Sequence, residues 1–230
     1  MDKIFRTFIF SDGHGNLKNF EKLKTEMNKS DLILFAGDFT KYNSKKTGLP
    51  FVNAIAELTK PTFSVLGNCD HPEIFEATKQ KNLSVDATVK KFDKLYIAGS
   101  GGGSKFTGTS PYERSDEELV SDLAPAEKKL KAGEIKNDSL IVITHNPPFE
   151  TKLDRTLIAN VGSKLIRAFI EKWQPLLHIS GHIHESFAID KLGKTVLVNP
   201  GTLADGRYAL CEIIKKDKTF SIGEIKLMKI

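Results

Sequence analysis

The chain has 230 residues, of which 40% are hydrophobic and 27% are charged. This composition is ordinary for a globular protein and excludes disordered, collagenous and membrane-embedded chains. The 34 basic and 29 acidic residues leave a net charge of +5, but 29 of the basic residues are lysines scattered along the sequence. A solvated lysine-rich surface is therefore favoured over a nucleic-acid-binding face. The length fits one domain spanning residues 1–230.

Short apolar runs followed by polar or glycine-containing turns are typical of buried strands. Six of them occur, at residues 4–10, 32–36, 63–66, 140–143, 176–179 and 196–198. Helical spacing of apolar residues separates several of these runs, around residues 17–27, 51–58 and 161–173. Ser115 and Glu118 form a capping-box pattern that predicts one more helix. The alternation predicts an α/β fold.

The last third of the chain has a different pattern, because no helical segment follows residue 183. Four strands are predicted there, at residues 187–190, 194–198, 208–214 and 220–227, with turns at Asp190, Gly193 and Asp217. We expect these strands to form a second, largely antiparallel sheet that packs on the first.

Cys69 and Cys211 are too few for a disulfide framework, and this is typical of proteins from a reducing compartment. The first apolar run contains Arg6 and is too short for a signal peptide or a membrane span. The sequence therefore predicts a cytoplasmic protein with no membrane partner.

Side chains that commonly bind metals follow five of the predicted strands. These are Asp12 and His14, Asp38, Asn68, His145, and His182 and His184. Because the carboxyl ends of strands in an open α/β sheet share one edge, residues from five distant segments can meet there. A single histidine at a strand end is usually structural, but four of the six histidines in the chain belong to this set.

The set combines two carboxylates, four imidazoles and one amide oxygen, a mixture suited to Mn, Fe, Zn, Co or Ni. Seven ligands are too many for one tetrahedral ion. Two divalent ions about 3.5–4 Å apart that share one carboxylate use all of them, and such a pair stabilises both oxygens of a phosphoryl transfer. We expect two divalent transition-metal ions, with Mn²⁺ as the first choice.

The residues resemble the calcineurin-like metallophosphoesterases, whose motifs are D-x-H, G-D, G-N, a lone H and G-H-x-H. The chain has Asp12-Gly13-His14, Gly37-Asp38, Gly67-Asn68, His145 and Gly181-His182-Ile183-His184 in the same order, and Asn199-Pro200-Gly201 is similar to the small bacterial and archaeal members. The resemblance implies a four-layer α-β-β-α sandwich of two mixed sheets, with a dinuclear metal centre at the strand ends.

The resemblance also implies roles for the seven residues. Asp12, His14 and His184 hold the first metal, Asn68, His145 and His182 hold the second, and Asp38 bridges the two. A metal-bound hydroxide then attacks phosphorus in line. The four imidazoles must be neutral to bind metal, so we expect activity to fall in mild acid.

The chain departs from the common family pattern at Cys69, where many members have a histidine that protonates the leaving group. His71 is the candidate for this general acid, together with Asn68 as a further catalytic residue. The competing interpretation places His71 in a turn before a helix, because Pro72 follows it. Cys69 is expected to pack in the loop rather than act as a nucleophile, since Asp70 opposes thiolate formation.

Arginine is scarce in this chain, with five residues, so an arginine near the strand ends is informative. Arg155 and Arg207 are candidates for binding the substrate phosphate. A surface salt bridge explains either residue equally well.

The leading hypothesis is a metal-dependent phosphoesterase acting on phosphodiesters or phosphomonoesters of small molecules, with nucleotides among the candidate substrates. One alternative is a nuclease, although no DNA-binding domain is expected and nucleic acid is a disfavoured partner. Another is a non-catalytic scaffold on the same fold, which retention of all the metal-site histidines disfavours. The oligomeric state, the native metals and the natural substrate do not follow from the motifs.

Overall fold

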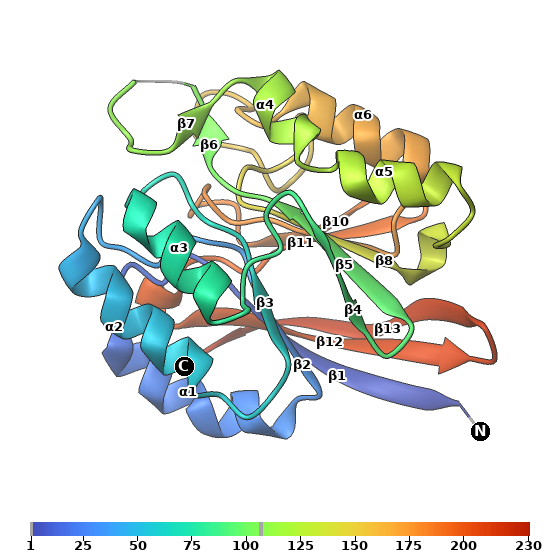
Figure 1. Cartoon of the computed structure of the whole chain (residues 1–230), viewed down its shortest axis with the longest axis horizontal. Coiled ribbons are helices and arrows are strands. Elements are labelled where there is room, and N and C mark those ends of the chain that lie inside the picture. The colour runs from blue at the N-terminus through green and yellow to red at the C-terminus, as the bar shows by residue number, and fades with distance from the viewer. Residues whose placement is uncertain (1, 106–107) are drawn as a thin grey trace.

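Two mixed β-sheets lie face to face between two layers of helices in the computed structural model, which describes residues 2–105 and 108–230 (Figure 1). The predicted four-layer α-β-β-α sandwich is confirmed. One sheet has five strands in the order β13-β12-β1-β2-β3. Its strands are β1 (Lys3–Phe10), β2 (Leu32–Phe35), β3 (Thr62–Ser64), β12 (Arg207–Lys216) and β13 (Thr219–Lys229).

The other sheet has six strands in the order β10-β11-β9-β8-β5-β4. Its strands are β4 (Val89–Phe92), β5 (Leu95–Ser100), β8 (Leu140–Thr144), β9 (Leu177–Ile179), β10 (Ala188–Leu192) and β11 (Thr195–Asn199). A short pair, β6 (Gly103–Ser104) and β7 (Glu113–Arg114), lies outside both sheets. The hairpin of β4 and β5 is not among the strands predicted from the sequence.

Helices cover the outer face of each sheet (Figure 1). On the five-stranded sheet lie α1 (Leu17–Lys29), α2 (Lys45–Ala56) and α3 (Pro72–Gln80). On the six-stranded sheet lie α4 (Asp116–Ser121), α5 (Ala124–Lys131) and α6 (Lys164–Trp173). The predicted capping box of α4 is present, with Glu118 and Ser115 bonded reciprocally.

Strand β1 shows why the sequence folds into layers. Its last four residues are all buried, and successive side chains point to opposite faces of a sheet. Phe8 and Phe10 pack toward the helices, whereas Phe5 and Ile9 pack into the core between the two sheets. A strand segment buried on both faces is a continuous apolar run, which is the pattern of residues 8–10.

The expectation of a separate sheet in the last third of the chain is wrong. Strand β11 joins the six-stranded sheet by pairing parallel with β9, and β12 joins the five-stranded sheet by pairing antiparallel with β1. The strands are contiguous in sequence but fill the free edges of two different sheets. Hydrogen bonding needs only an open edge, so the order along the chain does not determine the partner.

Candidate metal centre

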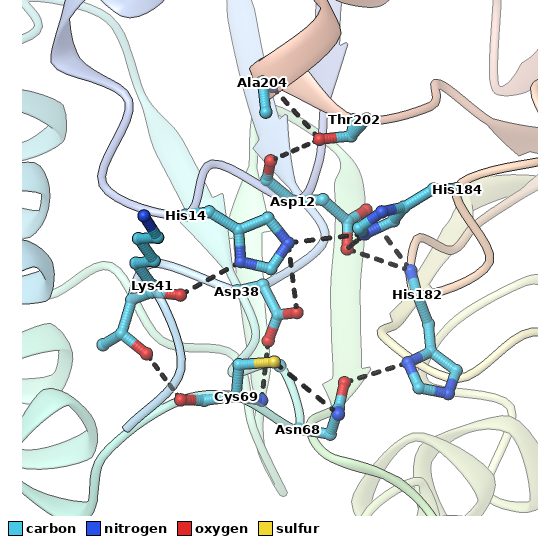
Figure 2. Close-up of polar contacts among 12 residues, drawn as sticks. Asp12, His14, Asp38, Lys41, Asn68, Cys69, His182, His184, Thr202 and Ala204 are labelled. Carbon is cyan, nitrogen blue, oxygen red and sulfur yellow. Dashed lines mark hydrogen bonds and ion pairs between the residues drawn. The ribbon is translucent and has the colours of Figure 1, made fainter. Parts of the chain in front are cut away.

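The seven candidate ligands converge at the carboxyl ends of strands from both sheets. Loops after the parallel strands β1, β2 and β3 carry Asp12, His14, Asp38 and Asn68. Loops after the parallel strands β8 and β9 carry His145, His182 and His184. Figure 2 shows most of these side chains pointing toward one another from separate segments. The expectation that five distant segments meet at one edge agrees with this arrangement.

The backbone at this edge adopts an unusual conformation. Four of the seven residues have positive φ angles, namely Asp12 (51°), His14 (45°), Asp38 (62°) and His182 (69°). The left-handed region costs a residue with a side chain roughly 1–2 kcal/mol. Strain of this kind persists where the surrounding structure enforces it, and it clusters at functional sites. The loops therefore hold these side chains in place at the expense of backbone strain.

Two imidazoles are oriented by backbone carbonyls. The Nδ1 of His14 lies 3.1 Å from the carbonyl oxygen of Thr40, and the Nδ1 of His145 lies 2.7 Å from that of Ala36. A carbonyl oxygen can only accept, so Nδ1 is the protonated nitrogen in each ring. In the neutral ring, Nε2 then carries a lone pair, which points into the cluster. Histidine ligands in metalloproteins are fixed in the same way.

On one side of the cluster, imidazole nitrogens and carboxylate oxygens converge on one point. The Nε2 atoms of His14 and His184 are 3.3 Å apart. The Nε2 of His184 is also 3.2 Å from Asp12 Oδ1, and the Nε2 of His14 is 3.7 Å from Asp38 Oδ2. These atoms form a group of nitrogen and carboxylate oxygen donors that suits a divalent transition-metal ion.

On the other side, the amide of Asn68 is the centre of the contacts. Its Nδ2 donates to the hydroxyl of Ser110 at 3.0 Å, so Oδ1 faces the imidazoles. Asn68 Oδ1 lies 3.0 Å from His145 Nε2 and 2.9 Å from His182 Nδ1. At His145 the Nδ1 holds the proton of the neutral ring, so its Nε2 and Asn68 Oδ1 repel each other at this distance, and a cation between them removes the repulsion.

Asp38 lies between the two groups. Its Oδ2 is 3.7 Å from His14 Nε2 and 3.6 Å from His145 Nε2. The carboxylate is almost fully buried, and its Oδ1 accepts a hydrogen bond from the backbone N–H of Cys69 at 2.9 Å. The residues present therefore fit two cations that share Asp38, which is the donor arrangement of a dinuclear centre.

The electrostatics of the cluster follow from burial and from the contact between Asp12 and His184. Burial favours the neutral acid at Asp12, but the hydrogen bond from His184 and the nearby imidazoles hold the pKa of its carboxyl well below its usual range. The same hydrogen bond raises the pKa of His184 to about 9. Burial instead lowers the pKa of His182 to about 4. Before a metal binds, His184 therefore carries a proton at neutral pH.

Two glycines of the motifs allow close approaches. A methyl group at Gly67 would overlap the carboxylate of Asp38, and one at Gly181 would overlap the hydroxyl of Ser11 and the carboxylate of Asp12. Any other residue displaces these ligands. Steric overlap thus explains why glycine occupies the first position of the G-N and G-H-x-H motifs.

Asp70 supports the site, and the sequence reasoning did not assign it a role. Its Oδ1 accepts from the backbone N–H of Thr40 at 2.9 Å, and its Oδ2 accepts from that of Gly67 at 2.8 Å. Asp70 thereby ties the loop after β2 to the loop after β3. Burial and the charge of Asp38 raise its pKa to about 7. Its place beside the G-N motif was visible in the sequence, but its burial was not.

Thr202 supports the other end of the site, and it too was missed. Its hydroxyl donates to the carbonyl oxygen of Asp12 at 2.9 Å and accepts from the backbone N–H of Ala204 at 3.1 Å (Figure 2). The predicted Asn199-Pro200-Gly201 turn places Thr202 there, so this turn fixes the backbone of a candidate ligand.

Cys69 lies in the loop beside Asn68, as expected for a packing residue. The Nδ2 of Asn68 is 3.7 Å from its sulfur, and burial together with the charge of Asp38 raises the pKa of its thiol strongly. A thiol that stays protonated is a poor nucleophile.

His71 caps helix α3. Its Nδ1 accepts a hydrogen bond from the backbone N–H of Glu73 at 3.1 Å. Pro72 occupies the first turn of the helix, as the turn interpretation supposed. The capping bond uses Nδ1, so Nε2 is the nitrogen that could donate a proton. The role of His71 as general acid stays a prediction.

The two candidate arginines have different surroundings. The guanidinium of Arg207 donates to the carbonyl oxygen of His184 at 3.0 Å and lies over the ring of Phe187. It therefore braces the loop that carries His184. The carbonyl oxygen of Arg155 accepts from the hydroxyl of Ser186 at 2.7 Å, and the residue lies at the rim of a shallow depression lined by Glu150 and Asp190. A role for either arginine in binding phosphate stays a prediction.

Comparisons with known proteins agree with this geometry. The calcineurin-like phosphoesterase family model matches residues 5–186. An uncharacterized protein of Methanocaldococcus jannaschii is 31% identical over 207 residues, covering 87% of this chain and 89% of the relative. The family uses a dinuclear divalent metal site.

Solved structures share the fold. A protein of Thermus thermophilus superposes with a TM-score of 0.71 at 18% identity, covering 96% of this chain and 99% of the other. A dimetal phosphatase of Danio rerio gives a TM-score of 0.64 at 8% identity, covering 98% of each chain. Among the described residues, no helix has the length and apolar character needed to cross a membrane.

Proposed function

Because the chain belongs to the calcineurin-like phosphoesterase family, we propose that it is a metal-dependent hydrolase of phosphoric esters that prefers phosphodiesters. The substrate is a small phosphorylated molecule of the nucleotide type, and the enzyme acts in the cytoplasm. Both cysteines are free, in keeping with a reducing compartment. The observation that carries the proposal is the convergence of imidazole nitrogens, carboxylate oxygens and one amide oxygen around Asp38.

We assign the two cation positions as follows. Asp12, His14 and His184 hold one ion, Asn68, His145 and His182 hold the other, and Asp38 contacts both. Mn²⁺ is the first choice, and Fe, Zn, Co or Ni also suit the donors. When bound, the ions supply Lewis-acid charge and a nucleophile derived from water at neutral pH.

The residues of the chain set the charge and geometry of the site. Asp12 and Asp38 are the two anionic ligands, and the four imidazoles and the amide are neutral. Two divalent ions with these ligands leave roughly two net positive charges, which attract a phosphate oxyanion. The Asp70 bonds and the Thr202 bond keep the ligand-bearing loops in position. His71 remains our candidate for the leaving-group proton, and Arg155 and Arg207 for additional phosphate contacts.

Metal analysis combined with hydrolysis of aryl phosphate probes tests the proposal. Wild type is expected to carry about two transition-metal ions per chain and to hydrolyse a bis-aryl phosphodiester faster than an aryl phosphomonoester. Asp38→Asn is expected to lower both metal content and turnover by about 100-fold or more, because it removes the shared charge.

Asp217→Asn is the matched control, since Asp217 lies exposed in the turn between β12 and β13 and has a similar φ angle of 54°. This variant is expected to behave as wild type. Absence of bound metal and of hydrolysis in wild type contradicts the proposed function and favours a scaffold role, and equal rates for wild type and Asp38→Asn contradict catalysis at the proposed metal centre.

A further inference from the structure

A groove with a volume of about 390 Å³ lies outside the ligand cluster, on the helix side of the loops after β5 and β8. One wall is formed by Ser104 and Lys105, and the other by Phe149, Val161 and Lys164. None of these residues is a candidate metal ligand.

The first wall begins at the metal centre. Gly103 packs against the cluster so closely that a methyl group there would lie 3.2 Å from the ring of His182 and 3.0 Å from the Cβ of Asn68. The next residue, Ser104, donates its backbone N–H to Asn146 Oδ1 at 3.0 Å. Lys105 follows at once. The groove therefore starts one or two residues from a candidate ligand contact.

The second wall also begins at a candidate ligand. Phe149 is four residues after His145, a separation that spans at most about 14 Å of extended chain. Its backbone N–H donates to the carbonyl oxygen of Ser163 at 3.0 Å, which anchors this wall to the start of α6. Both walls of the groove therefore begin within a few residues of the candidate ligands.

The charged side chains that line the groove, apart from Arg114, are two lysines, Lys105 and Lys164, and one carboxylate, Asp116. Among the residues that the structure describes, neither Lys105 nor Lys164 takes part in a salt bridge, although Glu118 is near enough to feel the charge of Lys105. The carboxylate of Asp116 is occupied, since it accepts from the hydroxyl of Ser163 and from the backbone N–H of Leu165.

Arg114 also lines the groove, but its guanidinium is not available to a ligand. It forms a bidentate pair with Asp122 and donates to the carbonyl oxygens of Gly101 and Glu118. The two lysines are therefore the cations that a ligand can meet. Phe149 and Val161 also line the groove, and the ammonium of Lys164 lies 5.1 Å from the centroid of the half-buried ring of Phe149.

We propose, on the basis of the proposed phosphoesterase function, that this groove binds the part of the substrate that does not react, and that this part carries a second phosphate on a flat apolar group. A nucleotide-type phosphodiester with a phosphate remote from the scissile bond has this chemistry. Lys105 and Lys164 bind the remote phosphate, and Phe149 and Val161 contact the ring.

Two matched substrates test the proposal: the p-nitrophenyl ester of thymidine 5'-phosphate and the same ester with an added 3'-phosphate. Wild type is expected to have a KM about tenfold lower for the second compound, since two lysines bind the added charge. In the double variant Lys105→Ala/Lys164→Ala this preference is lost, whereas hydrolysis of bis(p-nitrophenyl) phosphate stays unchanged.

Lys22→Ala/Lys128→Ala removes the same charge from two exposed helical lysines and is expected to keep the preference. Binding of thymidine 3',5'-bisphosphate, measured by calorimetry, gives a readout that needs no turnover, and it should weaken about tenfold in the groove variant only.

Equal KM values for the two esters in wild type, or equal binding of the bisphosphate by wild type and the groove variant, overturn the groove proposal and leave the phosphoesterase function intact. Absence of hydrolysis of every ester, with binding that depends on the two lysines, supports the groove and overturns the function.

Discussion

The two sheets contribute different chemistry to the same site. The five-stranded sheet supplies both carboxylates, Asp12 and Asp38, together with His14 and Asn68. The six-stranded sheet supplies His145, His182 and His184 and no carboxylate. All the anionic charge of the candidate centre thus comes from one half of the fold, and three of its four imidazoles come from the other.

This division means that neither half is a metal site alone. Without His184 from the other sheet, Asp12 would be only a buried carboxylate. Without Asn68 and Asp38, His145 would be only a buried imidazole. The cluster of candidate ligands forms because the two sheets pack together, through the core between them and through close contacts where their loops meet. Three kinds of change should therefore have separable effects on metal binding and stability. The first is at the contact between the sheets, the second affects an imidazole, and the third affects a buried carboxylate.

The largest effect is expected from Gly181→Ala, at the contact between the two sheets. The new methyl group would overlap Ser11 and the carboxylate of Asp12, so the loop of the six-stranded sheet must move away from the five-stranded sheet. We expect metal content, measured by elemental analysis, and turnover to fall about 100-fold or more.

Gly133→Ala is the control for that variant. Gly133 has a φ of +68°, but a methyl group there meets no atom within 4 Å. It should lower the free energy of unfolding by about 1 kcal/mol and leave metal content unchanged. Full metal occupancy in Gly181→Ala would show that the close approach of the sheets is not needed.

A smaller effect is expected from pH on the imidazole side. The hydrogen bond to Asp12 raises the pKa of His184 to about 9, so below that pH a metal ion must displace a proton from this ring. Displacing one proton makes metal affinity increase about tenfold per pH unit from pH 7 to 9. Burial keeps His182 neutral over this range, since its pKa is about 4.

Competition with a chromophoric chelator, corrected for the chelator's own protonation, measures this slope. His184→Gln removes the proton and should give weaker binding with little change between pH 7 and 9. A wild-type affinity that is constant across this range contradicts the assignment of the proton to His184.

The sequence was sufficient to predict that the candidate ligands lie together, because they follow apolar strands and a strand end is recognisable from local composition. Asp12, Asp38 and His182 could be placed at one edge for this reason. The pairing of β12 with β1 and of β11 with β9 could not, since an open sheet edge accepts strands from anywhere in the chain.

The roles of side chains were harder to predict from the sequence than their positions. The cap formed by His71 and the bond from Arg207 to the carbonyl oxygen of His184 depend on contacts a few ångströms long between segments whose relative placement no local pattern encodes. The groove beside the centre is formed by three such segments. Asp70 was visible beside its motif, but its structural role depends on burial.

Asp12 and Asp86 show how surroundings change a buried carboxylate. Both are almost fully buried. The imidazoles around Asp12 keep its pKa low, whereas Asp86 accepts from the hydroxyl of Ser84 at 2.8 Å and weakly from the backbone N–H of Leu66 at 3.4 Å. Burial therefore prevails at Asp86 and raises its pKa to about 7.

The smallest effect is expected from Asp86→Asn. The folded chain keeps the Asp86 proton up to about pH 7, but the unfolded chain loses it near the usual value of 3.8. Between these values the folded state binds more protons, so Asp86 makes stability fall as pH rises, by at most about 1.4 kcal/mol per pH unit. Asp86→Asn removes this contribution. The free energy of unfolding of the variant minus that of wild type should therefore be larger at pH 8 than at pH 4.

Urea unfolding at the two pH values measures the difference, with Asp217→Asn as an exposed control that keeps the wild-type dependence. Asp70, whose pKa is also raised to about 7, contributes a similar dependence to every variant, so the difference between wild type and Asp86→Asn isolates one carboxyl. The metal content of Asp86→Asn should equal that of wild type, because Asp86 binds none of the seven ligands. An unchanged pH dependence in Asp86→Asn would mean that Asp86 is already ionised at low pH, which would require a cationic partner comparable to the imidazoles around Asp12.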